Sequence, residues 1–299
     1  MTSPVRTSFP IGLIGLGLMG GAFATRLLRG GFSVIGCDLD ATCRTVFVQQ
    51  GGTNVPTAND VLEQCDRVIL SLPSHREVGQ VIAAAKGAFR AGQIIIDTTT
   101  GDPEHTEAIA AELAAVGVTY LDATISGNSA QVREGTAVVM VGGDATAYAT
   151  CSDVLAKLGC ESFHTGPSGS GAKMKLVTNL VLGLNRAALA EGLALGEAIG
   201  LDPQLTLRVM RRSPAYSRAM DVKGEKMIRS EFSPDARLSQ HLKDVRLMLQ
   251  LGGHAGLPMI LSAAHRAILE QAEAAGLGAL DNSALIQVLR GLTSKGASA

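Results

Sequence analysis

Aromatic residues and any excess of charge are what this sequence lacks. Of its 299 residues only 3% are aromatic and none is Trp, which argues against the base-stacking surfaces used by proteins that bind single-stranded nucleic acid. Lys and Arg together number 26, and Asp and Glu number 27. The chain therefore has no overall attraction for a nucleic-acid backbone or an anionic membrane, and we expect neither as a partner.

Paired cysteines and metal-ligand spacings are also missing. The five cysteines form an odd set without a C-x-x-C pair, and the six histidines show no ligand-like spacing. We expect free thiols in a reducing compartment, the cytoplasm, and no bound metal. Residues 1–10 lack the apolar core of a signal peptide, and the uncharged run Ile11–Thr25 is too short and too rich in glycine to span a bilayer.

Short apolar runs alternate with helix-length segments from Ile11 to about His164. This alternation predicts an α/β domain over residues 1–165, with a mostly parallel sheet covered by helices on both faces. In its clearest helix, Asp102–Gly117, Asp102 is the N-cap and Pro103 the first helical residue. The predicted strands are Ile11–Ile14, Val34–Cys37, Val68–Leu72, Ile94–Ile96, Val118–Leu121 and Ala137–Val141.

Strand signals vanish after the turn-rich segment Gly166–Gly171, so residues 166–299 are predicted to form an all-α domain. A long apolar helix is expected from Ala172 to about Ile199. At about 1.5 Å per residue it is long enough to cross between the domains or into a partner subunit. We interpret the charge clusters Arg211-Arg212 and Lys223–Lys226 as solvated helix faces. Further helices are predicted at Pro203–Arg212, Leu238–Leu251, Pro258–Ala275 and Asn282–Leu292.

The glycine loop Gly15-Leu16-Gly17-Leu18-Met19-Gly20 has the pattern G-x-G-x-x-G between the first predicted strand and a helical stretch. In such a loop Gly15 permits the tight turn, Gly17 lets the backbone approach a pyrophosphate, and Gly20 lets helix and strand pack closely. The helix N-terminus then offers unpaired N–H groups to the phosphates. The loop predicts a dinucleotide site, the alternative being a merely structural turn.

The end of the second strand predicts which dinucleotide binds. Asp38, followed by Leu39, lies where a carboxylate can accept hydrogen bonds from the adenosine ribose and repel a 2′-phosphate. No Lys or Arg occupies Leu39–Cys43, although Arg44 follows directly. We therefore expect a preference for NAD over NADP, without excluding NADP.

A polar stripe interrupts the long apolar helix. Gly171, Lys175, Asn179 and Gly183 recur at every fourth position and share one face. We expect the helix to be buried, so that Lys175 needs a partner or a purpose, and we interpret the flanking glycines as room for a ligand. The alternative is that Lys175 extends its ammonium to water, as we expect for Lys173.

Beside a bound nicotinamide, such a lysine has a chemical role. In carbonyl reduction its ammonium polarises the oxygen and donates a proton, whereas in alcohol oxidation the neutral amine takes the hydroxyl proton. The latter requires a pKa well below the free value of about 10.4, which burial or a nearby cation would produce. Asn179 could hold either the lysine or a substrate hydroxyl.

From Ile11 to about Leu292 the sequence resembles the β-hydroxyacid dehydrogenase family, typified by 3-hydroxyisobutyrate dehydrogenase. The resemblance is carried by five motifs in order: G-L-G-x-M-G at Gly15–Gly20, Asp122-Ala-Thr-Ile-Ser126-Gly127, G-x-x-x-K-x-x-x-N at Gly171–Asn179, Lys243-Asp244, and Asp281-Asn-Ser283-Ala284. It implies a Rossmann domain joined by a long helix to an all-helical domain like that of 6-phosphogluconate dehydrogenase, assembled as a homodimer or homotetramer.

The resemblance also implies roles for individual residues. Lys175 matches the catalytic lysine, Asn179 completes the substrate site, and Lys243 matches a second lysine near cofactor and substrate. Carboxylate-binding residues match Ser126 and Gly127, and segments lining the cofactor match Leu72-Pro73 and Thr100.

Asn128 departs from the family, which often has a second glycine there. It could contact a polar substrate or tolerate an unusual backbone angle. Three hypotheses follow for the whole chain: an NAD-dependent dehydrogenase of a small β-hydroxy acid, a relative acting on a more polar acid such as tartronate semialdehyde, threonate or a serine-like compound, and a non-catalytic module that senses NAD(H).

Overall fold

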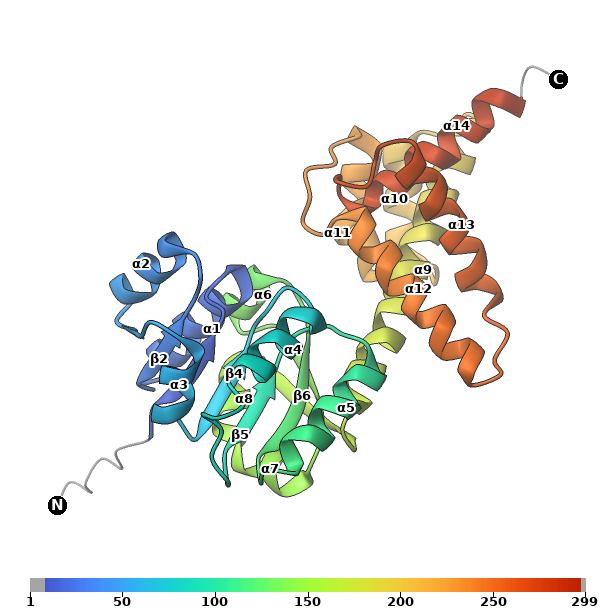
Figure 1. Ribbon diagram of the computed structural model, residues 1–299. Coiled ribbons are helices and arrows are strands. Elements are labelled where there is room, and N and C mark those ends of the chain that lie inside the picture. The colour runs from blue at the N-terminus through green and yellow to red at the C-terminus, as the bar shows by residue number, and fades with distance from the viewer. Residues whose placement is uncertain (1–8, 297–299) are drawn as a thin grey trace. The chain divides into compact units, whose positions relative to one another are not determined.

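The computed structural model describes residues 9–296, with side chains to residue 291. The chain divides into two compact units, one ending at Lys175 and the other beginning at Leu176 (Figure 1). The division falls inside helix α9 (Ser170–Ala198), beyond the predicted junction at Gly166–Gly171. The first turn of α9 thus belongs to the α/β unit. Among the described residues, no helix is long and apolar enough to cross a membrane.

The first unit is built on an eight-stranded sheet with the order β3-β2-β1-β4-β5-β6-β7-β8. Every neighbouring pair is parallel except β6 and β7, which are antiparallel. The mostly parallel sheet predicted from the sequence is confirmed. The strands are β1 (Ile11–Ile14), β2 (Val34–Cys37), β3 (Thr53–Asn54), β4 (Arg67–Leu70), β5 (Ile94–Asp97), β6 (Thr119–Ser126), β7 (Val138–Gly142) and β8 (Glu161–Gly166).

The sequence did not predict the two edge strands, β3 and β8. The first has only two residues, both exposed, and the second contains Glu161, His164 and Thr165 and has no fully buried residue. Edge strands have one neighbour and little apolar cover, so they lack the continuous apolar run by which a central strand is recognised.

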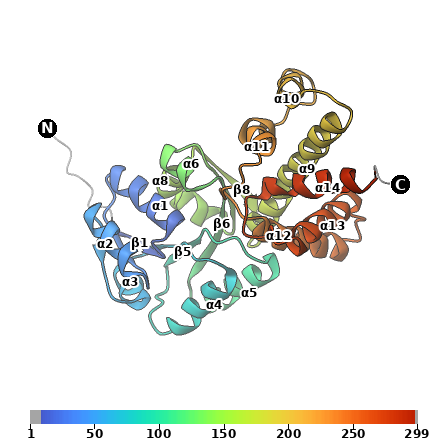
Figure 2. The same cartoon turned by 90° about the horizontal axis from the view of Figure 1, so that it is seen from above.

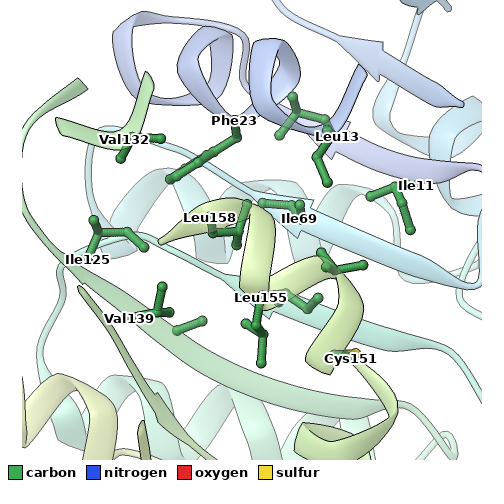
Figure 3. Close-up of a cluster of buried hydrophobic side chains, with 14 of the residues drawn as sticks. Ile11, Leu13, Phe23, Ile69, Ile125, Val132, Val139, Cys151, Leu155 and Leu158 are labelled. Carbon is green, nitrogen blue, oxygen red and sulfur yellow. The ribbon is translucent and has the colours of Figure 1, made fainter. Parts of the chain in front are cut away.

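Helices cover both faces of this sheet (Figure 2). Helices α1, α6, α7 and α8 contribute to one apolar core, in which Phe23, Leu13, Ile69 and Leu155 are buried (Figure 3). Helices α3, α4 and α5 contribute to the core on the other face. The first-unit helices are α1 (Leu18–Arg29), α2 (Ala41–Gln49), α3 (Ala58–Gln64), α4 (His75–Ala84), α5 (Pro103–Ala114), α6 (Ser129–Glu134), α7 (Ala145–Thr150) and α8 (Ser152–Leu158).

Helix α5 begins as its sequence predicted. The carboxylate of Asp102 accepts a hydrogen bond from the Glu104 amide, and Pro103 is the first helical residue. A short polar side chain satisfies one of the unpaired amides of a helix start, and proline needs no amide partner there.

The described part of the second unit is helical, as predicted, around a single core that includes Leu189, Leu193 and Leu242. Its helices after α9 are α10 (Pro203–Arg212), α11 (Arg218–Arg229), α12 (Leu238–His254), α13 (Ile260–Ala274), the 3₁₀ turn η1 (Asn282–Leu285) and α14 (Ile286–Gly296). Helix α11 was not predicted, although its charged residues lie within it.

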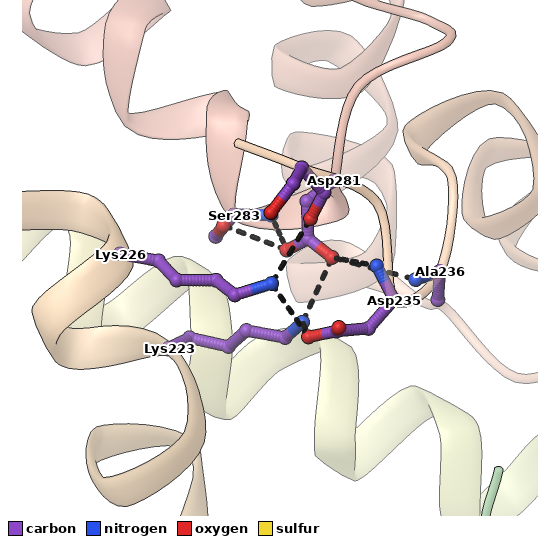
Figure 4. A network of polar contacts seen from close by, with 7 residues as sticks. Lys223, Lys226, Asp235, Ala236, Asp281 and Ser283 are labelled. Atoms are coloured by element: carbon purple, nitrogen blue, oxygen red, sulfur yellow. Dashed lines mark hydrogen bonds and ion pairs between the residues drawn. The ribbon is translucent and has the colours of Figure 1, made fainter. Parts of the chain in front are cut away.

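The interpretation of Lys223 as a solvated residue is wrong. Its side chain is 10% exposed, and Nζ lies 2.8 Å from the fully buried carboxylate of Asp281 and 3.0 Å from that of Asp235 (Figure 4). Ser283 also donates to Asp281, over 2.7 Å. This network joins α11 to η1, so the charge has a structural partner that lies 58 residues away in the sequence.

Candidate active site

Each of the three glycines in the loop after β1 is required for a different geometric reason. Gly15 has φ +94°, and a Cβ there would lie 2.2 Å from the Ser71 carbonyl oxygen. A Cβ on Gly20 would lie 1.9 Å from the Gly15 carbonyl oxygen, so α1 packs directly on the turn. Among the described residues, and apart from its own neighbours in the chain, nothing lies within 4 Å of the Cβ position of Gly17. Packing explains Gly15 and Gly20, whereas Gly17 leaves bare backbone at the start of α1, which fits a dinucleotide pyrophosphate.

The side chains between these glycines differ in exposure. Leu16 is buried, Met19 packs against the core, and Leu18 is 79% exposed. The loop is therefore anchored on both sides of its exposed tip, with the first amides of α1 beyond it.

Asp38 follows β2 and is tied to the glycine loop. Its Oδ2 accepts a 2.6 Å hydrogen bond from the Leu16 amide, and its Oδ1 accepts one of 2.8 Å from the Asp40 amide. Arg44 stabilises the same turn, since its Nη1 donates to the carbonyl oxygens of Asp38 at 2.8 Å and Leu39 at 2.9 Å. The Leu39 side chain is fully exposed. The carboxylate is thus fixed beside the loop, as ribose recognition requires.

The segments predicted to line the cofactor lie at the ends of neighbouring strands. Leu72 and Pro73 follow β4, Thr100 follows β5, and the Leu72 amide donates to Thr99 Oγ1 over 3.3 Å. Strand β1 lies between β2 and β4, so the chain order reverses beside the glycine loop. In open α/β sheets ligands bind at such a reversal, outside the carboxyl ends of the strands.

Strand β6 brings the predicted substrate loop to the carboxyl edge of β5. Ser126 is the last residue of β6. Gly127 has φ +151°, and a Cβ there would lie 2.9 Å from Ala137 Cβ, so both conformation and space favour glycine.

Neither predicted role of Asn128 describes its main contact. Its φ is −102°, which is ordinary for any residue, so the proposal of an unusual backbone angle is wrong. Its Oδ1 accepts a 2.9 Å bond from the Gln131 amide, and Gln131 Oε1 accepts one of 3.0 Å from the Asn128 amide. Asn128 is the N-cap of α6.

Lys175 reaches the end of β6. Its Nζ donates a 2.6 Å hydrogen bond to the carbonyl oxygen of Ile125, next to Ser126. The side chain is half-buried rather than fully buried, and apolar neighbours on α9 such as Val177 are exposed, so the prediction of a buried helix is wrong at this point. Lys173 instead points to the surface, where it pairs with Glu107 at 2.7 Å. The two lysines therefore differ as predicted.

The glycines flanking this stripe do not leave room for a ligand, contrary to the prediction. A Cβ on Gly171 would lie 2.3 Å from the Asp122 carbonyl oxygen. A Cβ on Gly183 would lie 2.4 Å from His241 Nε2 and 3.0 Å from His265 Cε1. Protein atoms fill both positions, so these glycines serve close packing within each unit.

Asn179 and Lys243 belong to the second unit. Asn179 Nδ2 donates to the Asp244 carboxylate over 3.1 Å, and Asp244 is buried on α12 beside the half-buried Lys243. A carboxylate only accepts hydrogen bonds, so the amide nitrogen must face Asp244 and Oδ1 must face away. Asn179 therefore presents an acceptor, which suits a hydroxyl donor.

Two buried acids of the α/β unit were not assigned a role from the sequence. Burial raises the pKa of Asp97 to about 6, and Tyr120 donates to it over 2.5 Å. Burial also raises the pKa of Asp122, whose carboxylate accepts bonds from backbone amides at the start of α9. The sequence did contain a signal for them, since each acid lies in an otherwise apolar strand. A carboxylate buried in such a strand requires hydrogen-bond partners.

Comparison with known proteins identifies the family of this chain. Residues 10–166 match the family described as the NAD binding domain of 6-phosphogluconate dehydrogenase, and residues 169–289 match that described as NAD-binding of NADP-dependent 3-hydroxyisobutyrate dehydrogenase. The chain belongs to the β-hydroxyacid dehydrogenase family. As a member of it, the protein is an oxidoreductase with a domain that binds a nicotinamide adenine dinucleotide.

Relatives of this dehydrogenase cover nearly its whole length. It is 32% identical over 290 residues to an L-threonate dehydrogenase of Cupriavidus necator, covering 96% of this chain and 98% of the relative. It is 34% identical to a 2-(hydroxymethyl)glutarate dehydrogenase of Eubacterium barkeri, covering 96% of each. The structure of 3-hydroxyisobutyrate dehydrogenase from Mycobacterium tuberculosis with L-serine superposes with a TM-score of 0.86 at 26% identity, over 94% of this chain and 99% of that one.

Proposed function

We propose that this dehydrogenase interconverts a small β-hydroxy acid and its semialdehyde, with NAD(H) as the preferred cofactor and Lys175 as the general acid and base. The observation that carries the proposal is the position of the Lys175 ammonium, 2.6 Å from the Ile125 carbonyl oxygen and directly beside Ser126. Ser126 ends β6 on the edge where the loops after β1, β2, β4 and β5 carry the predicted cofactor residues.

Each residue has a defined task in this reaction. When bound, NAD(H) supplies or accepts the hydride. In the reducing direction Lys175 donates a proton to the substrate oxygen, and in the oxidising direction its neutral amine removes the hydroxyl proton. The loop Ser126-Gly127-Asn128 binds the substrate carboxylate, and the Asn179 Oδ1 accepts a hydrogen bond from the substrate hydroxyl. The family resemblance implies that Lys243 serves cofactor and substrate as a second lysine.

The relatives favour a more polar acid as the second candidate substrate. Besides L-threonate dehydrogenase, a 2-hydroxy-3-oxopropionate reductase of Escherichia coli is 30% identical over 282 residues. Both names denote acids with more than one oxygen-bearing carbon besides the carboxylate. The Asn128 side chain retains its Nδ2 for such an oxygen, since its Oδ1 is the atom committed to the α6 cap.

The experiment is a panel of hydroxy acids with three to five carbons, assayed for NAD reduction, and the matching semialdehydes assayed for NADH oxidation. Turnover of 3-hydroxyisobutyrate supports the first candidate, and exclusive turnover of threonate or tartronate semialdehyde supports the second. Tight binding of NADH without turnover of any acid would overturn the proposal in favour of an NAD(H)-sensing module.

A homodimer or homotetramer is part of the proposal. Support comes from the second unit, where Leu195 on α9, Ile199 directly after it and Val209 on α10 are apolar and exposed, at 60%, 65% and 58%. Exposed apolar side chains of this size favour burial against a partner. Light scattering after size-exclusion chromatography tests it, and a monomer at assay concentration would contradict it. The five unpaired cysteines support a cytoplasmic location.

A further inference from the structure

The strand that ends at the substrate loop also anchors the helix that carries Lys175. Asp122 lies in β6 and is 2% exposed. One of its carboxylate oxygens, Oδ1, accepts a 2.9 Å hydrogen bond from the Gly169 amide, and Oδ2 accepts one of 2.9 Å from the Ala172 amide. These amides belong to the start of α9, where no preceding helical turn can pair them. A carboxylate there satisfies two of them and opposes the positive end of the helix dipole.

Helix and strand are in direct backbone contact at this point. A Cβ on Gly171 would lie 2.3 Å from the Asp122 carbonyl oxygen and 2.7 Å from that of Met140, so only glycine permits the approach. Thr124 is the next residue of β6 on the same face as Asp122, and its Oγ1 donates to the Gly171 carbonyl oxygen over 2.9 Å. The first turn of α9 is therefore held to β6 at its amides, at a carbonyl and by close packing.

Lys175 makes the last contact of the same series. It follows Ala172 by three residues on α9, and so lies on the same helix face. Its acceptor, the carbonyl of Ile125, follows Asp122 by three residues on β6. Three residues of β6 thus contact the start of α9: Asp122 binds the Ala172 amide, Thr124 the Gly171 carbonyl oxygen, and Ile125 the Lys175 ammonium.

We propose that Asp122 is a positioning residue that sets the place of the Lys175 ammonium by fixing the first turn of α9, and that Thr124 assists it. This inference rests on the proposed role of Lys175. Its reason is geometric. Lys175 reaches the Ile125 carbonyl oxygen from a backbone position that the contacts of Asp122 and Thr124 hold, so a shift of this backbone moves the ammonium, and a misplacement of about 1 Å can cost about 100-fold in rate.

The test begins with Asp122→Asn, which keeps the shape but replaces one acceptor by an NH₂ group facing an amide donor. We expect kcat to fall about 10- to 100-fold while the KM for the acid and the Kd for NADH stay near wild type. The matched control is Asp144→Asn. Asp144 caps α7 through the Ala147 amide at 2.8 Å in the same unit, and its variant should keep full kcat.

A double-mutant cycle separates positioning from a general loss of structure. If Asp122 acts through Lys175, adding Asp122→Asn to Lys175→Ala leaves the residual rate unchanged, because the group being positioned is already gone. Additive losses, or a normal kcat in Asp122→Asn, would overturn the proposal. Should Asp122→Asn fail to fold, Thr124→Val removes the hydroxyl that donates to the carbonyl oxygens of Gly171 at 2.9 Å and Met140 at 3.4 Å, and the same non-additivity with Lys175→Ala is required of it.

A readout that needs no substrate separates this inference from the proposed function. The Cε resonance of Lys175 in ¹³C-lysine-labelled protein, assigned by its loss in Lys175→Ala, should shift in Asp122→Asn and stay in place in Asp144→Asn. An enzyme inactive on every acid that still shows this shift would refute the proposed function alone. An unmoved Lys175 resonance in Asp122→Asn would refute the positioning role.

Discussion

Asn179 donates its side-chain N–H to the Asp244 carboxylate over 3.1 Å, which leaves its oxygen as the atom that can face a substrate. Asp244 is buried and its carboxylate can only accept hydrogen bonds, so the NH₂ group of Asn179 must point toward it. An acceptor in this position distinguishes a hydroxyl from a carboxylate, since only the hydroxyl can donate.

Replacing Asn179 by Ala should therefore weaken binding of the hydroxy acid. Loss of one hydrogen bond is worth about 1 kcal/mol, which corresponds to a rise of about 5- to 10-fold in KM. Steady-state kinetics with the best acid of the panel measures it. Asn185→Ala, on an exposed face of the same helix, is the control and should behave as wild type. An unchanged KM in Asn179→Ala would remove the residue from the substrate site.

Asp38→Asn should shift cofactor preference toward NADP. The substitution removes the charge that repels a 2′-phosphate, while Arg44 remains bound to the carbonyl oxygens of the same turn. Hydrogen bonds to charged groups contribute about 1.5–3 kcal/mol, so the ratio of kcat/KM for NAD to that for NADP should fall about 10- to 100-fold. Asp40→Asn, two residues further along, should leave the ratio unchanged. A wild-type enzyme with equal efficiency on both cofactors would contradict the assignment.

Lys223→Ala should destabilise the helical unit strongly. It leaves the carboxylate of Asp281, which is fully buried, without its cation, and breaking a buried pair costs about 3–5 kcal/mol. Burial raises the pKa of Asp281, but the bonds from Lys223 and Ser283 outweigh it and lower the pKa to about 2. Urea unfolding at pH 7 measures the loss. Lys226→Ala breaks a pair with the half-exposed Asp235 and should cost less than about 1 kcal/mol; equal losses would refute the distinction.

Two neighbouring histidines should make stability fall in mild acid. The rings of His241 and His265 lie 5.1 Å apart. Burial, with the charge of Arg186 adding to it, lowers the pKa of His265 from 6.5 to about 4 and that of His241 well below 6.5. Below about pH 6.5 the unfolded chain then binds more protons than the folded one. The free energy of unfolding therefore has its full value above about pH 6.5 and decreases as the pH falls toward 4.

His265→Phe tests that linkage. Within the window from pH 6.5 to 4, each such histidine contributes a slope of up to about 1.4 kcal/mol per pH unit. Thermal unfolding followed by circular dichroism at a series of pH values should show a shallower decline of Tm in the variant. His254→Phe, at an exposed position, should retain the wild-type decline. Parallel curves for His265→Phe and wild type would show that the pair does not titrate in this window.

The sequence predicted those parts of the molecule that local pattern determines. The six inner strands, the glycine loop and the cap of α5 depend on residues a few positions apart, and the structure has all of them. The role of Asp122 and the burial of Lys223 depend on partners distant in the sequence, 47 residues for Gly169 and 58 for Asp281. A periodic pattern carries no information about such partners.

The two glycines of the Lys175 stripe illustrate the same limit. The sequence shows the spacing of these glycines, but it does not show which atoms of other elements fill the space beside them. Gly171 meets the backbone of β6 and Gly183 meets two histidines of α12 and α13, so each was explained only when the neighbouring element was known.

The role of Lys175 as the proton donor is tested by the rate of hydride transfer in Lys175→Ala under single-turnover conditions, with NADH binding measured by fluorescence on the same sample. We expect a rate lower by about 10²- to 10⁴-fold, unchanged NADH affinity, and partial recovery on addition of methylamine, which can supply the missing acid. A variant that transfers hydride at the wild-type rate would contradict it, because the reaction would then proceed without the Lys175 proton.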